Sequence, residues 1–167
     1  MIMLRKTLLI LTAALGLTMS AHANLWDNRA QSSDRYGKPF QVDDANSLIT
    51  YSNSGWMITE WFDDAGWVES IVYYKMNGKL FTRQEINKIQ TANDFFADEW
   101  RHIAPNVWAN ATTDQRFETS SEQLNGKTIY RLILCTHKGY DGMNTAFQNA
   151  SNNPSQNQTE ANPKIAL

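Results

Sequence analysis

Cysteine is nearly absent from this chain of 167 residues, which contains only Cys135. One cysteine leaves no intramolecular disulfide to stabilise the fold, so the stability must come from hydrophobic burial. Six tryptophans make such a core feasible, because large aromatic side chains bury more area than any others. The length suits one domain with a sizeable core rather than two large domains.

Excess positive charge is also lacking, since the formal net charge at pH 7 is -2. A chain without a basic patch has little to displace the counterions of a phosphate backbone, so nucleic acid is not an expected partner. The sequence contains no glycine-rich phosphate loop, nucleophile elbow or zinc-ligand spacing. It therefore predicts no cofactor and no metal, and it favours a protein without catalytic activity.

Long apolar runs are missing except near the N-terminus, where one extends from Thr7 to Met19 behind a basic head. This run is shorter than the roughly 20 residues that cross a bilayer. The motif Ala-His-Ala at 21–23 has the small-x-small pattern of a signal peptidase site. We expect residues 1–23 to be a cleaved signal peptide. The mature chain would start at Asn24, have no membrane span, and be periplasmic or secreted.

The clearest structural signal is a pair of apolar runs, Trp56 to Phe62 and Trp67 to Tyr74. They flank the segment Asp-Asp-Ala-Gly at 63–66, which is typical of a hairpin whose turn is closed by a glycine. Branched and aromatic residues favour strands in both runs. A further strand at Ser47 to Asn53 completes a predicted three-strand meander.

A helix is predicted next, because Thr82 and Glu85 have the spacing of a capping box. Phe81 and Ile86 stand where a hydrophobic staple belongs, before the cap and at the fourth helical residue. We favour an end of this helix at Asn93. The alternative is one helix running on to Ala104, because apolar residues continue at three-and-four spacing.

The remaining elements suggest two similar halves. A short helix is expected within Leu25 to Tyr36, and strands are expected at 107–111, 116–121 and 127–137. The predicted class is α+β, with two helix-plus-three-strand units, about 24–80 and 81–140, forming an antiparallel sheet packed on helices in a single domain, 24–140. Residues 141–167 are expected to be a disordered tail, since from Asn144 the chain is rich in Asn, Gln and Ser.

Residues 35–39, Arg-Tyr-Gly-Lys-Pro, precede a meander that contains Gly55-Trp56, Phe62, Gly66 and Ile71. This arrangement resembles the helix-then-three-strands layout of small bacterial envelope domains of the SmpA/OmlA type, the outer-membrane assembly lipoproteins. The beta-lactamase inhibitor protein, with two such units in tandem, is similar in architecture. The resemblance covers roughly Leu25 to Tyr74 and implies a location in the cell envelope. The lipidated cysteine of those lipoproteins has no counterpart here.

Two pairs of residues offer an enzymatic alternative, a small exported hydrolase. Cys135 and His137 alternate onto one face of a predicted strand, where a thiol and an imidazole could approach each other. Asp98 and His102 lie four residues apart, so on a helix they would share a face. A buried small hydrophobe explains the cysteine better, and a solvated polar face explains the second pair better.

The surplus of aromatic residues in the strands is the stronger functional signal. Met57, Thr59 and Trp61 alternate with a second apolar set, so one set must form the core and the other could be exposed. We expect an exported non-catalytic binding or adaptor domain of the bacterial cell envelope that binds a protein or envelope component through an aromatic sheet face. The candidate binding residues are Trp61, Met57, Thr59, Trp67 and Tyr73. The alternative is that the two halves bury both sets.

Overall fold

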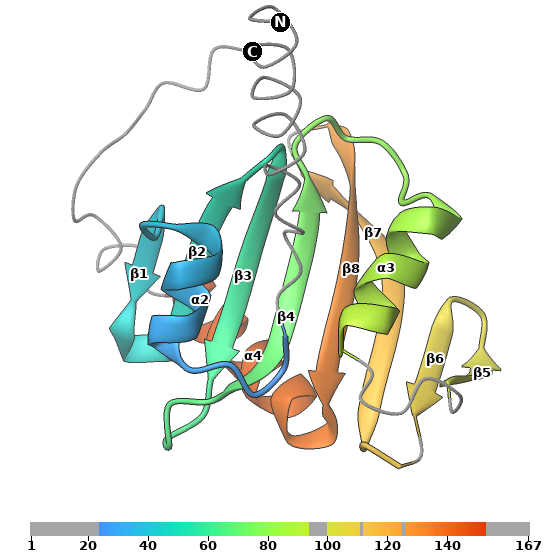
Figure 1. Cartoon of the computed structure of the whole chain (residues 1–167). Coiled ribbons are helices and arrows are strands. Elements are labelled where there is room, and N and C mark those ends of the chain that lie inside the picture. The colour runs from blue at the N-terminus through green and yellow to red at the C-terminus, as the bar shows by residue number, and fades with distance from the viewer. Residues whose placement is uncertain (1–23, 94–99, 111, 125, 153–167) are drawn as a thin grey trace, which may run out of the picture.

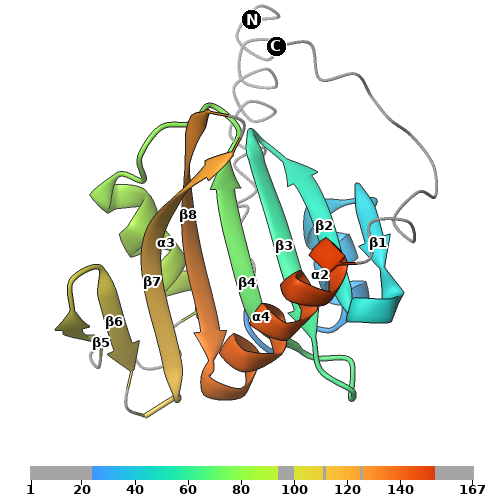
Figure 2. The same ribbon diagram turned by 180° about the vertical axis from the view of Figure 1, so that it is seen from behind.

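The computed structural model describes residues 24–93, 100–110, 112–124 and 126–152. Its elements, in chain order, are α2 (Arg29–Tyr36), β1 (Gln41–Asp43), the short 3-10 helix η1 (Asp44–Asn46), β2 (Leu48–Asn53), β3 (Trp56–Phe62), β4 (Val68–Lys75), α3 (Arg83–Asn93), β5 (Trp100–Ala104), β6 (Val107–Asn110), β7 (Gln115–Leu124), β8 (Lys127–Thr136) and α4 (His137–Asn152). The strands form one antiparallel sheet in the order β1-β2-β3-β4-β8-β7-β6-β5. Helices α2 and α3 lie on one face of this sheet, and α4 crosses the other (Figure 1 and Figure 2).

The core lies between the sheet and helices α2 and α3. One row of directly paired residues crosses all eight strands on that face: Val42, Ile49, Glu60, Ile71, Leu134, Phe117, Trp108 and His102. Tyr36 of α2 and Ile89 of α3 are buried against the same core. The members of the row nearest the sheet centre are buried, and the acid among them, Glu60, has no exposed surface.

This single sheet corrects the prediction of two helix-plus-three-strand units. Each half of the chain contributes four strands, and β4 pairs with β8 to join the halves edge to edge, with Ser70 opposite Cys135 and Tyr74 opposite Arg131. The two strands that the sequence did not reveal, β1 and β5, are the edges of the sheet and have 3 and 5 residues. Edge strands are short and poorly patterned, so period-two alternation gives little signal there.

The locally encoded elements are confirmed. The meander forms β2, β3 and β4, and α3 starts as the capping box predicts. The backbone N–H of Thr82 donates to Glu85 Oε2 at 2.7 Å, and the N–H of Glu85 donates to Thr82 Oγ1 at 3.2 Å. The helix ends at Asn93, so the longer alternative is wrong, and residues 100–104 form a strand.

Helix α4 differs from the predicted tail, because it continues through Asn144 to Asn152. The Thr136 hydroxyl caps its start by accepting from the N–H of Gly139 at 2.9 Å. Gly139, Met143 and Ala146, spaced three or four apart, form its buried face. The sequence did not predict this helix, because its few apolar residues stand among many polar ones. The predicted signal peptide, residues 1–23, and the remainder of the tail, 153–167, lie outside the described residues.

Candidate functional site

An open groove of about 230 Å³ lies between α3 and the hairpin of β7 and β8. Its lining combines an apolar wall with a floor that presents hydroxyl groups: Leu80, Phe81, Ile86, Asn106, Thr119, Ser120, Ser121 and Tyr130. The hydroxyl of Ser120 accepts from Arg131 on the other face of the sheet, so Thr119, Ser121 and Tyr130 supply the hydroxyl groups of the floor. The wall comes from α3 and the segment before it. The floor comes from the two strands, on which Ser121 pairs directly with Tyr130.

Lys75, at the end of β4, fixes the apolar wall to the sheet. Its ammonium donates to the carbonyl of Leu80 at 3.1 Å and to Glu85 Oε1 at 2.9 Å. The rings of Trp56 and Phe81 flank the same ammonium at 5.7 and 5.9 Å from their centroids. These contacts hold the start of α3 and the residues before it in one position.

Glu85 accepts from both Lys75 and the helix cap, which keeps it charged. Partial burial raises the pKa of this carboxyl, but hydrogen bonds from Thr82 and Lys75 outweigh burial and hold the pKa below its usual range. At neutral pH the pair of Lys75 and Glu85 is therefore an ion pair, with Nζ 2.9 Å from Oε1.

Asn106 closes one end of the groove from the turn between β5 and β6. Its carbonyl accepts from the N–H of Thr119 at 3.0 Å. The backbone of Asn106 has φ of 61°, a left-handed conformation that asparagine tolerates better than most residues. Trp108 packs edge-on against Phe117 at 5.5 Å, which supports the strands beside this turn.

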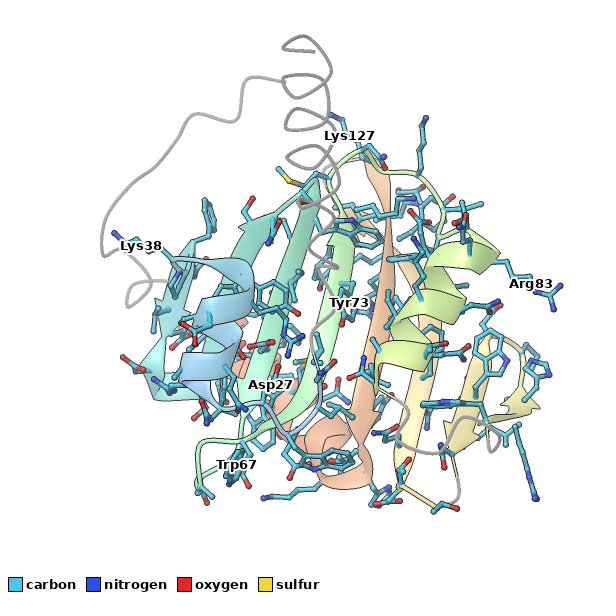
Figure 3. All side chains as sticks on the ribbon, viewed as in Figure 1. Asp27, Lys38, Trp67, Tyr73, Arg83 and Lys127 are labelled. Carbon is cyan, nitrogen blue, oxygen red and sulfur yellow. The ribbon has the colours of Figure 1, made fainter. Side chains whose placement is uncertain are left out.

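The charge around the groove is positive on the α3 side. Lys79, Arg83 and Lys88 are exposed there, and none of them forms an ion pair with another described residue. Arg83 points away from the sheet into solvent (Figure 3).

The groove is lined by uncharged side chains. The eight lining residues include hydroxyl, amide and apolar side chains, but no carboxylic acid, imidazole, thiol or amine. Among the described residues, no group of three or more His, Cys, Asp or Glu could hold a metal ion. The groove can bury an apolar group and exchange hydrogen bonds with polar groups next to it.

Three of the five predicted binding residues lie together, on the sheet face that α4 crosses. Met57 and Trp61 are half-buried, and Thr59 is buried with its hydroxyl 3.0 Å from that of Thr50. The other two lie elsewhere. Tyr73 is 1% exposed and belongs to the core under α2 and α3, whereas Trp67 precedes β4 and is 44% exposed (Figure 3).

Three of the four residues of the enzymatic alternative lie in the described part of the chain. Cys135 is buried, and burial raises the pKa of its thiol to about 12. His137 is exposed at the start of α4, because β8 ends at Thr136. His102 lies on β5, where its ring is 5.3 Å from that of Trp108. Asp98 lies outside the described residues.

Glu60 is a polar site that the sequence reasoning missed. It lies on β3 between Ile58 and Phe62, two buried residues of the same sheet face. Burial raises the pKa of its carboxyl to about 8, which the Ser32 hydroxyl and Arg35 oppose and the charge of Asp27 reinforces. An acid at an alternating apolar position was the available signal.

Comparisons of the chain with protein-family models, with curated proteins and with solved structures find no match. The resemblance to outer-membrane assembly lipoproteins therefore stays a prediction. None of the helices in the described part of the chain is long and apolar enough to cross a membrane.

Proposed function

We propose that this protein is an exported, non-catalytic binding domain of the bacterial cell envelope, and that its groove beside α3 takes a large apolar side chain of an acidic protein partner. The observation that carries the proposal is the combination of an apolar wall, Leu80, Phe81 and Ile86, with a hydroxyl floor that has no acid, imidazole, thiol or amine. Such a lining suits an anchoring side chain whose backbone exchanges hydrogen bonds with the floor.

The size of the groove supports a side chain rather than a whole cofactor. Sites for small molecules and cofactors usually measure about 300 to 1,000 Å³ and bury most of the ligand. A groove of about 230 Å³ that is open to solvent falls below that range. One buried aromatic or leucine anchor is a common source of binding energy between proteins.

The positive charge beside the groove supports an acidic partner. Lys79, Arg83 and Lys88 are exposed without ion partners in the described chain. Charge complementarity of this kind speeds encounter and selects against basic partners, and it weakens as salt is added.

The sheet face on which the sequence placed the binding residues has less exposed surface for a partner. Helix α4 covers Trp61, whose ring lies against Gly142. Thr59 of the same set has almost no exposed surface. We therefore keep the class of function that the aromatic strands predicted, and place its binding surface on the other face.

The test uses an acetylated pentapeptide with one phenylalanine between two acidic residues on each side. We expect it to shift the NMR amide signals of Thr119, Ser121 and Tyr130, and to do so less at high salt. Two control peptides replace the phenylalanine by alanine or the acidic residues by lysine. Equal shifts with the alanine peptide, or none with any peptide at millimolar concentration, would contradict the proposal.

A matched pair of variants tests the location. Ser121→Trp puts an indole into the groove from an exposed position and should abolish the shifts. Ser52→Trp places the same ring at an exposed position of β2, on the opposite face of the sheet, and should leave them unchanged. Export is tested separately, by the mass of the protein recovered from the periplasm or medium of an expressing bacterium, which should correspond to a chain that starts at Asn24.

A further inference from the structure

Glu60 is a carboxylic acid with no exposed surface. Within the described chain neither of its oxygens has a hydrogen-bond partner of normal geometry, although the Ser32 hydroxyl is near enough to lower the pKa of the carboxyl. On the neighbouring strands the residues directly opposite are Ile49 and Ile71. A charged carboxylate here would lose its hydration and gain nothing comparable in return. The neutral acid is therefore the form that suits this position.

Three hydroxyl groups close to Glu60 are in the same situation. Ser32 Oγ and Tyr36 OH of α2 and Tyr51 OH of β2 are buried and have no hydrogen-bond partner among the described residues. The rings of Tyr36 and Tyr51 are only 5.1 Å apart. A protonated carboxyl can donate one hydrogen bond and accept others, and hydroxyl groups rotate to suit it. A neutral Glu60 can therefore both donate to and accept from these hydroxyl groups, so the cluster does not require a charged carboxylate.

The charged groups around the cluster leave Glu60 without a counterion. Arg35 is the cation on α2 that faces it, and Arg35 donates from Nη2 and Nε to Asp27 Oδ2 at 2.7 and 3.1 Å. The charge of Asp27 itself disfavours a second anion nearby. A second cation of α2, Arg29, acts on Tyr51 and is paired with Asp44 Oδ1 at 2.8 Å. The phenols of Tyr36 on α2, Tyr51 on β2 and Tyr73 on β4 also face the cluster, and burial raises the pKa of Tyr36 and of Tyr51.

Helix α2 is the element that covers this acid. It has 8 residues, from an Asn28 cap to Gly37, a length at which an isolated helix is marginal in water. Its position therefore depends on its contacts with the sheet, which include the ring contact of Tyr36 with Tyr51. A charge on Glu60 would act directly beneath these contacts.

We propose that Glu60 is a proton-controlled latch, in which the neutral carboxyl holds α2 against the sheet and loss of the proton releases α2 while the sheet stays folded. The latch is independent of the groove, which lies beside α3. With α2 released, the carboxyl is in water and ionises at its ordinary pKa of 4.5, whereas in the closed state it keeps its proton to a pKa of about 8. The equilibrium constant for release of α2 therefore rises between pH 4.5 and pH 8, by about tenfold per pH unit at most, and is constant above that range.

The test is backbone hydrogen exchange, expressed as protection factors so that the intrinsic pH dependence of exchange cancels. Between pH 5 and pH 7 we expect protection of the hydrogen-bonded α2 amides, such as those of Ser32 and Gly37, to fall about a hundredfold. In Glu60→Gln, which cannot ionise, the same amides should keep their protection. In both proteins the amides of β4 and β8 should stay better protected than those of α2 at each pH, because they exchange only when the sheet itself unfolds. An equal fall in Glu60→Gln, or α2 amides as well protected as those of β4 and β8 at every pH, would overturn the latch.

A second measurement needs no variant. The carbon-13 carboxyl signal of Glu60 in the wild-type protein, assigned through its own backbone, should have the shift of a neutral acid at pH 6. A charged carboxylate at pH 6 would overturn the proposal whether or not Glu60→Gln folds. Tyr51→Phe provides the matched control, because it removes one hydroxyl and leaves the acid in place. It should retain the neutral signal and the pH-dependent protection of α2.

Discussion

The indole ring of Trp61 lies against Gly142, in the space that a side chain at position 142 would need. Three residues earlier on the same face of α4, a side chain at Gly139 would meet the backbone carbonyl of Glu69 even more closely. The two glycines allow the helix to lie directly on β3 and β4. Trp61, one of the predicted binding residues, therefore packs against α4.

We expect the two glycines to respond differently to alanine. In Gly139→Ala the new methyl group meets backbone that cannot move aside, so the free energy of unfolding should fall by at least about 2 kcal/mol. In Gly142→Ala it meets the side chain of Trp61, which can shift, and alanine gains about 1 kcal/mol in helix propensity. Urea denaturation measures both, with Asn144→Ala on the exposed face of α4 as the control. Equal stability of the two glycine variants would show that α4 does not rest on the sheet at Gly139.

The sequence predicted those elements whose signals are local. The Asp-Asp-Ala-Gly turn at 63–66, the alternation of β3 and β4, and the capping box of Thr82 and Glu85 each lie within a few residues, and all three are present. The pairing of β4 with β8 joins residues about 65 positions apart, such as Ser70 and Cys135, and nothing local encodes it. Without that pairing the halves look like separate units.

The predictions about the binding site also succeeded where the signal was local and failed where it depended on distant segments. The alternation that put Met57, Thr59 and Trp61 on one face was correct. The sequence did not show that a helix covers this face, because few residues of α4 are apolar and buried. Tyr73 lies on the opposite face, where it pairs with Ile58 and Leu132. Only the register between β3 and β4 shows which face of β4 continues which face of β3. The groove needs α3, β7 and the turn at Asn106 at once, so no single segment carries its signal.

The cap of α3 gives a direct test of a local signal. Thr82→Ala removes the hydroxyl that accepts from the N–H of Glu85, and we expect a loss of about 1 kcal/mol in the free energy of unfolding. Thr91→Ala, at an exposed position of the same helix, should cost nothing comparable. Thermal and urea unfolding followed by circular dichroism will separate the two. A loss as large in Thr91→Ala would mean that the cap contributes nothing particular.

The stability of the protein should fall as the pH rises from 4.5 to 8. The unfolded chain releases the Glu60 proton near 4.5, while the native protein keeps it to about 8, so in this window the native state binds more protons. The free energy of unfolding then decreases by up to about 1.4 kcal/mol per pH unit. Urea denaturation of wild type and Glu60→Gln at several pH values isolates this contribution as their difference. A difference that does not change with pH would contradict it.

Asp63 makes the free energy of unfolding depend on pH in the opposite direction, and it does so at lower pH. Burial raises the pKa of this carboxyl, but hydrogen bonds from the Trp67 backbone and from Lys138 outweigh burial and lower it. Its contribution is present above the unfolded pKa and is lost as the pH falls through the folded pKa. With Glu60 acting above 4.5, the maximum of stability should lie in mildly acidic solution.

Cys135 should be inert in the folded protein. Burial raises the pKa of its thiol to about 12, so almost no thiolate is present at neutral pH, and no surface of the residue is exposed. We expect iodoacetamide to label it only after denaturation, as measured by intact mass. Ser54→Cys, at an exposed turn, provides the positive control, because one site should label rapidly while Cys135 does not. Fast labelling of the wild-type protein at neutral pH would favour the hydrolase alternative.

Two truncations test what the second half of α4 contributes. A chain that ends at Asn152 keeps the whole helix, and the Asn- and Gln-rich residues that it loses have too little apolar surface to add much stability. A chain that ends at Met143 also loses Ala146, which is buried, and Phe147, which is half-buried, from the apolar face of α4. We expect the first truncation to leave the melting temperature nearly unchanged. The second should cost more than about 1 kcal/mol, which lowers the melting temperature of a domain of this size by several degrees.

Tryptophan fluorescence recorded during the same thermal scan should also report greater solvent exposure of Trp61 in the shorter protein, because the half of the helix that remains will fray. If both truncations melt with the wild type and keep its fluorescence, then only the first turns of α4, from Gly139 to Met143, hold the helix on the sheet.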